Sequence, residues 1–237
     1  MYVVRGLYFL YSFCIALPLF LLTTIAVATT TMVAALCGDT DHVVNAVTKA
    51  WGKLTMWYFL LPVKIEGREQ LDKHQSYIFL ANHQGYLDIL LIYGYLGFNF
   101  KWMMKEYLKK IPFVGKACEM SKQIYVGDSR QSIAEAVKQS QTTLRSGMSM
   151  VIFPEGTRTR DGEVGEFKRG AFMLAGEIGL PIVPITITGS YECFNRRAWH
   201  VSWHPLKLTI HTPITVEEQQ TLNSKTLMQK VRSTIIG

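Results

Sequence analysis

The sequence predicts an α/β protein with a mixed central sheet flanked by helices, preceded by an N-terminal helical segment embedded in a membrane. Three observations favour this fold. Runs of strand-forming residues alternate with helical patterns over most of the chain. The N-terminal part contains a long uncharged stretch. Charged residues make up only 18% of the chain, against about 25% in a typical soluble domain.

The N-terminal stretch from Gly6 to Gly38 contains no charged residue. A spanning helix needs roughly 20 apolar residues, so the stretch is long enough to cross a bilayer once but not twice. Pro18 and the threonines at 29–31 could divide it, and a hairpin that dips into one leaflet is an alternative. The apolar core of a signal peptide is only about 7 to 15 residues long, so cleavage is not expected.

Residues 41–60 predict an amphipathic helix, because Val44, Val47, Trp51, Leu54 and Tyr58 recur at helical spacing. Two interpretations are open. The helix lies on the bilayer surface, or it packs against the protein core.

The rest of the chain contains seven β-rich runs, at residues 63–65, 77–81, 100–103, 123–126, 150–153, 182–188 and 206–211. Helical patterns occupy residues 85–96, 129–144, 169–178 and 216–235. Ser129 or Ser132 is expected to cap the second of these helices, and Gly179 to end the third. There is no internal repeat and no long linker.

His83 and Asp88 are the first candidates for chemistry. The run 77–81 ends just before His83, and a helical pattern begins around Gly85, so both residues lie near a strand-to-helix turn. In one continuous helix, side chains five residues apart would point about 140° apart. A turn instead lets the Asp88 carboxylate orient the imidazole and stabilise its protonated form. Such a pair can deprotonate a hydroxyl, although a His followed by an Asp is more often incidental.

A second candidate site follows the run 150–153. Gly156 permits close approach of the backbone, Thr157 offers a hydroxyl, and Arg158 offers a planar fork of donors suited to phosphate. Lys168 precedes a helix, whose N-terminus favours anions. These features predict an anion site, and a solvated turn is the alternative.

The segment from Lys101 to Lys122 contains six lysines and two acids, Glu106 and Glu119, with apolar residues between them. This pattern is typical of a surface for anionic lipid or an acidic carrier protein, or of a plain solvated face. The net charge of +7 is compatible with nucleic acid, an anionic membrane surface or an anionic substrate, and does not distinguish among them. Nucleic acid is not expected, because it would have to coexist with the apolar N-terminal stretch.

Neither a metal nor a cofactor is expected. The sequence has no GxxxxGK phosphate loop and no HExxH zinc motif. His200 and His204 alternate with Trp199 and Trp203, which indicates an irregular aromatic segment rather than a metal site. The four cysteines form no CxxC pair and are interpreted as free thiols in a reducing compartment.

Three ordered blocks resemble the lysophosphatidic acid acyltransferases, also called 1-acyl-sn-glycerol-3-phosphate acyltransferases. They are Asn82-His83 followed by Asp88, the sequence FPEGTR at 153–158, and the sequence LPIVP at 180–184. Residues 105–115, with Pro112, resemble the second motif of that family. The similarity covers roughly residues 60 to 215. Arg130 lies later than the arginine usual in the family, and it is left out of the site.

The resemblance implies an enzyme that moves a fatty acyl group from acyl-CoA or acyl carrier protein to the free hydroxyl of 1-acyl-glycerol-3-phosphate, forming phosphatidic acid. His83 would be the base and Asp88 its partner. The substrate-binding residues would be Lys105, Glu155, Gly156, Thr157, Arg158 and Pro184, with Pro184 at the acyl site.

The resemblance also implies an organisation and partners. Residues 1–60 would be membrane-anchoring helices, and residues 61–237 an acyltransferase catalytic domain on the cytoplasmic face. The partners would be a lysophospholipid acceptor, the acyl donor and membrane lipid. One alternative is a related acyltransferase for another lyso-lipid, such as one that contains an amino acid, or for glycerol 3-phosphate. Another is a membrane-anchored lipid-binding protein without turnover.

Overall fold

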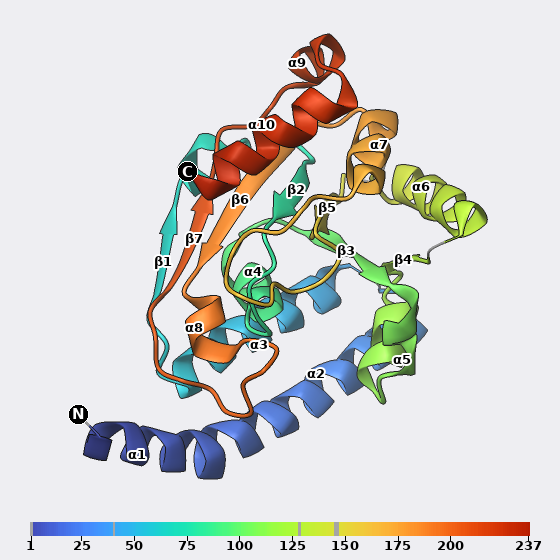
Figure 1. Ribbon diagram of the computed structural model, residues 1–237. Helices are drawn as coiled ribbons and strands as arrows, with labels where there is room; N and C mark the ends of the chain where they lie inside the picture. Colours follow the sequence, from blue (N-terminus) through green and yellow to red (C-terminus); the bar gives the residue numbers. More distant parts are fainter. Residues whose placement is uncertain (1, 40, 128, 145–146) are drawn as a thin grey trace.

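The computed structural model describes residues 2–39, 41–127, 129–144 and 147–237. Its centre is a seven-stranded sheet with the order β1-β7-β6-β2-β5-β3-β4 (Figure 1). All neighbouring strands are parallel except β6 and β7. The strands are β1 (Val63–Glu66), β2 (Ile78–Ala81), β3 (Phe100–Lys105), β4 (Ile124–Val126), β5 (Ser149–Ile152), β6 (Ile182–Thr188) and β7 (Leu206–Ile210). The predicted mixed sheet is confirmed, and each β-rich run forms a strand.

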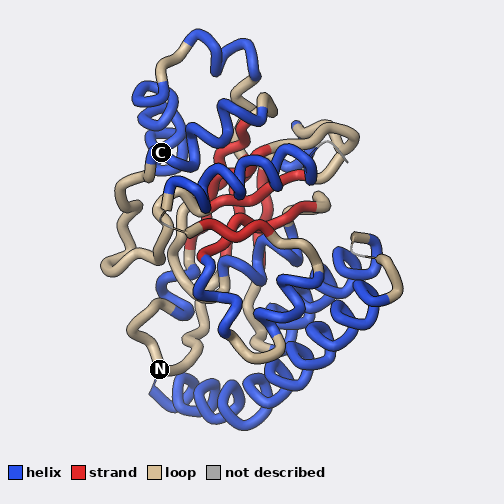
Figure 2. The backbone as a smooth tube through the Cα atoms, turned by 90° about the vertical axis from the view of Figure 1, so that its right-hand side faces the viewer, coloured by secondary structure: helices blue, strands red, loops and turns tan. Residues whose placement is uncertain are grey.

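Helices cover both faces of the sheet (Figure 2). The alternation of side chains along β2 shows how the two layers are joined, because successive residues of a strand point to opposite faces. Phe79 and Ala81 belong to one buried cluster, and Ile78 and Leu80 belong to the other. A strand that is buried on both faces has a continuous run of apolar residues, and residues 78–81 form such a run.

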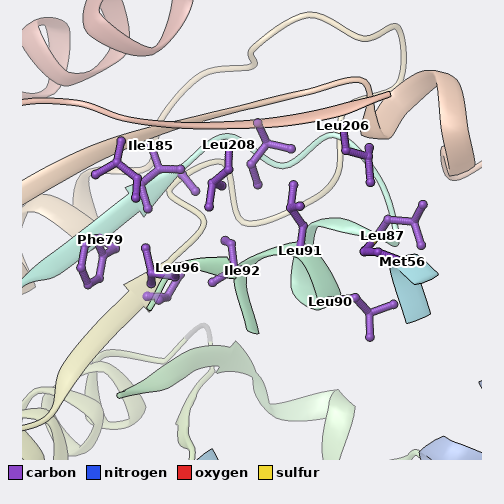
Figure 3. Close-up of a cluster of buried hydrophobic side chains, with 14 of the residues drawn as sticks. Met56, Phe79, Leu87, Leu90, Leu91, Ile92, Leu96, Ile185, Leu206 and Leu208 are labelled. Carbon is purple, nitrogen blue, oxygen red and sulfur yellow. The ribbon is translucent and has the colours of Figure 1, made fainter. Parts of the chain in front are cut away.

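The first buried cluster lies between the sheet and the helices α3 (His42–Tyr58) and α4 (Asp88–Tyr95). Figure 3 shows Met56 of α3 and Leu91 of α4 in this cluster, together with Leu208 of β7. The second cluster lies beneath α6 (Arg130–Leu144), α7 (Arg169–Ile178) and α10 (Ser224–Ile236). The shorter helices are α5 (Val114–Met120), α8 (Ser190–Phe194) and α9 (Val216–Thr221), with 3-10 turns η2 (Arg68–Gln70) and η3 (Glu106–Lys110).

The N-terminal stretch is one continuous helix made of α1 (Tyr2–Tyr11), the π-helical turn η1 (Ser12–Ala16) and α2 (Leu17–Leu36). The wide π turn comes just before Pro18, which has no backbone N–H to donate. The helix therefore passes through Pro18 without forming the alternative hairpin. Its portion Val3–Leu36 has 34 residues and contains an 18-residue stretch with a mean hydropathy of 2.2, so it is long and apolar enough to cross a membrane.

This N-terminal helix lies along the rest of the molecule, at the lower edge of Figure 1, and α2 packs against α3 and α5. The hydroxyls of Tyr8 and Tyr11 donate to the carbonyl oxygens of Phe59 and Tyr58. Helix α3 in turn packs on α4. Of the two interpretations of residues 41–60, the structure favours core packing for one face of the helix. The division at residue 60 stays a prediction.

The last predicted helix, 216–235, is in fact two helices. Leu222 has an extended backbone, and the side chain of Asn223 accepts a hydrogen bond from the N–H of Thr226, which starts α10. The predicted helix 85–96 begins only at Asp88, after a turn. Gly179 ends α7 with a φ of 69°, as the sequence predicted.

Candidate active site

His83 and Asp88 meet at the turn between β2 and α4. The Asp88 side chain is fully buried, and its Oδ2 lies 2.7 Å from Nδ1 of His83. The same oxygen accepts hydrogen bonds from the backbone N–H groups of Gln84 and Gly85, at 2.6 and 2.9 Å. Because a carboxylate oxygen can only accept, Nδ1 of His83 carries the ring proton. Nε2 therefore holds the lone pair that can take up a proton.

The turn around His83 is fixed by the end of β6 and by α8. A Cβ on Gly85 would lie only 2.6 Å from the carbonyl oxygen of Ser190 and 2.7 Å from that of Phe194, so glycine allows this close approach. The Asn82 side chain exchanges hydrogen bonds of 2.7 and 3.0 Å with the backbone N–H and C=O of Ile187. The position of His83 is thus set by the carboxyl edge of the sheet.

The plane of the His83 ring is set by Phe153, which immediately follows β5. The two rings stack with centroids 3.9 Å apart and planes 6° apart. Phe153 stacks in turn on Trp102 of β3, with centroids 5.2 Å apart. These aromatic contacts were not predicted, since Phe153 was expected only to end a strand. Its place at the end of an apolar strand, directly before the polar residues 154–158, was the signal that could have found it.

Glu155 lies behind the His83 turn and is buried. Its Oε1 accepts a hydrogen bond from the backbone N–H of His83 at 2.7 Å, and its Oε2 accepts one from Gly165 at 2.9 Å. Burial raises the pKa of the Glu155 carboxyl above its usual value, and the two N–H groups oppose that shift. The sequence suggested that Glu155 binds a ligand. In the structure, Oε1 of Glu155 holds the backbone of His83 and Oε2 holds that of Gly165.

Arg158 lies against Tyr86, with its guanidinium carbon 3.6 Å from the centre of the ring. Stacking occupies a face of the guanidinium, whereas its N–H donors lie in the plane of the group. The arginine is therefore oriented by the aromatic ring while its edge can bind a phosphate in a bidentate manner. Tyr86 was not among the predicted site residues, and its partner is visible only in the folded chain.

The other predicted anion-binding residues lie close by in the structure. Lys105 at the end of β3, Gly156 and Thr157 all line the same cavity as His83 and Arg158, and Thr157 is exposed. Gly156 has a φ of 69°, and a Cβ there would lie 3.0 Å from the side chain of Lys168. Lys168, just before α7, also lines the cavity. The predicted cations thus line the same cavity as His83, and so does Lys168.

The cavity that these residues line has a volume of about 610 Å³. We call it the large cavity. Much of its wall is apolar and comes from several elements, including α2 with Val27 and Ala28, α3 with Val44, β3 with Trp102 and α5 with Val114. An apolar cavity with a few convergent polar groups is the usual form of a site for a small molecule with a long apolar part.

Pro184 is not among the residues that line the large cavity. It is buried within β6, beside Leu80 of β2, and its carbonyl oxygen accepts a hydrogen bond from the N–H of His211. Pro184 was expected at the acyl site, and in the structure it lies inside the sheet.

The basic segment 101–122 is not a uniform surface. Lys101 is buried, and its Nζ binds the carboxylate of Asp41 at 2.7 Å and the carbonyl oxygen of Ser121 at 2.8 Å. This lysine ties the start of α3 to the sheet. Within the part of the chain that the structure describes, no group of three His, Cys, Asp or Glu side chains is placed to hold a metal ion.

Comparisons with known proteins identify relatives of the chain. The family model described as Acyltransferase matches residues 62–188. A chloroplastic 1-acyl-sn-glycerol-3-phosphate acyltransferase of Arabidopsis thaliana is 33% identical over 71% of this chain and 48% of its own length. A 1-acyl-sn-glycerol-3-phosphate acyltransferase of Borreliella burgdorferi is 28% identical over 78% of this chain and 74% of its own length. The chain spans about half the length of the plant relatives it matches first.

A solved structure covers nearly the whole chain. The 1-acyl-sn-glycerophosphate acyltransferase PlsC of Thermotoga maritima superposes with a TM-score of 0.77 and 26% sequence identity, over 98% of this chain and 93% of that one. Its match extends beyond the strands to the N-terminal helix. Because the family model covers more than half of the residues and the fold agrees, the chain belongs to the acyltransferase family, and its resemblance to the lysophosphatidic acid acyltransferases is confirmed.

Proposed function

We propose that this chain transfers a fatty acyl group from a thioester of coenzyme A or acyl carrier protein to the free hydroxyl of 1-acyl-glycerol-3-phosphate, forming phosphatidic acid. The observation that carries the proposal is the His83–Asp88 pair on an apolar cavity that Arg158 and Lys105 also line. A base, cations and an apolar cavity match a reaction between a fatty acyl thioester and a lipid phosphate. The names of the relatives support the same acceptor.

The proposed reaction needs one base and no covalent acyl-enzyme. Nε2 of His83 takes the proton of the acceptor hydroxyl while the hydroxyl oxygen attacks the carbonyl carbon of the thioester. The Nδ1–H stays hydrogen-bonded to Asp88, whose negative charge stabilises the imidazolium. The C–S bond then breaks, and the imidazolium gives its proton to the departing thiolate. The products are the new ester and a free thiol.

The acceptor phosphate is bound chiefly by Arg158, whose guanidinium is already oriented by Tyr86. Lys105 and Thr157 add a second cation and a hydroxyl. A hydrogen bond to a charged group contributes about 1.5 to 3 kcal/mol, so a few such bonds select a phosphate-bearing acceptor. The apolar wall of the large cavity holds the acyl chain of the donor.

The reaction takes place at a membrane surface in this proposal. The acceptor is a lipid, and the apolar helix Val3–Leu36 supports membrane association. The thioester donor comes from the cytoplasm, so we place the active site on the cytoplasmic face.

The test is release of free thiol from acyl-CoA by the purified full-length chain, with and without lysophosphatidic acid. We expect acceptor-dependent release, and His83→Ala should lower it by about 10² to 10⁴-fold, the usual effect of losing a general base. His74→Ala, at an exposed histidine, is the matched control. Near-normal turnover by folded His83→Ala protein would overturn the mechanism. Acylation of glycerol 3-phosphate or of an amino-acid-containing lyso-lipid, but not of lysophosphatidic acid, would overturn the acceptor.

A further inference from the structure

A second apolar cavity, of about 260 Å³, lies beside the large one. We call it the small cavity. One wall is the N-terminal helix, through Phe13, Leu17 and Phe20. The opposite wall is formed by Leu90 of α4 and by Val201, in the irregular segment between α8 and β7. The chemistry described above makes no use of this space.

The small and large cavities share a wall. Both are lined by Trp51 of α3, by Tyr86 in the turn before α4 and by Ile89 in the first turn of α4. Tyr86 is also the residue on which Arg158 stacks. The cation assigned to the acceptor phosphate therefore lies at the boundary between the two apolar spaces, next to the turn that carries His83.

The small cavity also borders the face of the helix that has the composition of a membrane segment. Phe13 and Leu17, which line it, are themselves 55% and 37% exposed. In a bilayer, these exposed surfaces would contact lipid. The small cavity has less than half the volume of the large one, so it encloses only part of a fatty chain. The rest of such a chain would lie among the lipid tails.

The reaction brings together two molecules that each carry a fatty chain. One chain arrives on the thioester, and the other is already attached to the acceptor. When the acceptor phosphate is at Arg158 and its hydroxyl at His83, its own chain has to leave along a path that the donor chain does not fill. Two adjoining apolar cavities on either side of Tyr86 provide two such paths.

We propose that the small cavity binds the first part of the 1-acyl chain of the lysophospholipid acceptor, while the large cavity binds the chain of the donor. This assignment rests on the proposed function and names the subsite by which the acceptor chain is recognised. The acceptor enters from the bilayer along the N-terminal helix, and its phosphate reaches Arg158 at the shared wall.

The test fills one cavity at a time. Val201→Phe and Leu17→Trp enlarge side chains of the small cavity from two different elements, so that a folding defect of one variant does not decide the result. Ala28→Phe, at a buried position of α2, fills the large cavity as the matched control. The KM is measured for a long-chain and for a short-chain, water-dispersed lysophosphatidic acid, and for long-chain and short-chain acyl-CoA.

We expect both small-cavity variants to raise the ratio of the long-chain to the short-chain acceptor KM by about tenfold, the effect of roughly two CH₂ groups that are no longer buried. Ala28→Phe should raise the corresponding ratio for the donor and leave that for the acceptor as in the wild type. The proposal is overturned if both small-cavity variants change the donor ratio instead, or change neither. If the wild type does not acylate lysophosphatidic acid at all, the proposed function itself is wrong. This outcome can be distinguished from a changed chain-length ratio in the variants.

Discussion

At the scale of single residues, two buried carboxylates define the site and have different tasks. Asp88 faces the imidazole and orients it, whereas Glu155 holds the backbone of His83 from behind. Both accept backbone N–H groups, so both fix the turn between β2 and α4. The chemistry of His83 thus depends on one carboxylate through its ring and on another through its main chain.

Glu155→Gln should lower kcat and leave the KM of the acceptor nearly unchanged. The amide keeps one oxygen acceptor but presents an NH₂ group to the other backbone N–H, and an unsatisfied buried donor costs about 1 to 3 kcal/mol. We expect kcat to fall by roughly 5 to 150-fold, as measured by thiol release. A large rise in the acceptor KM with a normal kcat would instead support the ligand-binding role that the sequence suggested.

Arg158→Ala should raise the KM of the acceptor more than that of the donor, by roughly 10 to 150-fold, because a hydrogen bond to a charged group is lost. Arg158→Lys should restore only part of the affinity, since an ammonium cannot bind phosphate in a bidentate manner or stack on Tyr86 in the same way. Steady-state kinetics with each substrate varied in turn provides the check. Equal effects on both substrates would argue against a phosphate contact.

At the scale of elements, the contact between α3 and α4 joins the N-terminal helices to the active site. The two helices cross at Gly52 and Gly94, where a Cβ on Gly52 would lie 2.3 Å from the carbonyl oxygen of Leu90 and 2.5 Å from the N of Gly94. These are backbone atoms, which cannot move aside as a side chain would. Since Asp88 begins α4, a displacement of this helix would also move the partner of His83.

Gly52→Ala should therefore destabilise the protein by about 1 to 3 kcal/mol, as overpacking of a tight contact does. Gly176→Ala in α7 is the matched control, because nothing lies within 4 Å of a Cβ at that position. There the change should be neutral or stabilising by about 0.5 to 1 kcal/mol, since alanine is the better helix former. Thermal unfolding in detergent measures both effects. An unchanged midpoint for Gly52→Ala would show that α3 and α4 can separate freely.

At the scale of the whole molecule, the N-terminal helix is both a candidate membrane segment and a wall of the large cavity. In its most apolar 18-residue stretch only 11% is buried, so most of the surface of that stretch is open to lipid. The remaining face packs against α3 and α5, and Val27 and Ala28 line the large cavity. The helix lies along the molecule instead of projecting from it (Figure 1), which brings the active site close to the surface of any membrane it enters.

Replacing Leu10 and Leu22 together by lysine should move the protein from the membrane fraction to the soluble fraction. Both are highly exposed on the apolar helix, and a lysine at the centre of a bilayer costs roughly 2.5 to 3.5 kcal/mol. The matched control replaces Met173 and Ile236, which are equally exposed but lie on α7 and α10. Sedimentation of membranes without detergent distinguishes the two variants. If the Leu10 and Leu22 variant stays membrane-bound as the control does, the N-terminal helix does not attach the protein to the membrane.

The sequence by itself determined the strands, the pairing of His83 with Asp88, the cations around them and the family. These features depend on neighbours along the chain: apolar runs between polar turns mark buried strands, and a strand-to-helix turn brings residues five apart together. The same local patterns did not show that the last predicted helix is two helices. The second of them, α10, begins at a cap formed by the single residue Asn223.

Only the tertiary structure decided where Glu155, Pro184 and the N-terminal helix lie. His83 and Glu155 are 72 residues apart, and they meet because β2 and β5 are neighbours in the sheet. The sheet order likewise buries Pro184 beside Leu80 of β2, where it does not line the large cavity, and the packing of α2, α3 and α4 contributes walls to both cavities. Such contacts arise from burial between segments distant along the chain, and no local spacing encodes which surfaces will face each other.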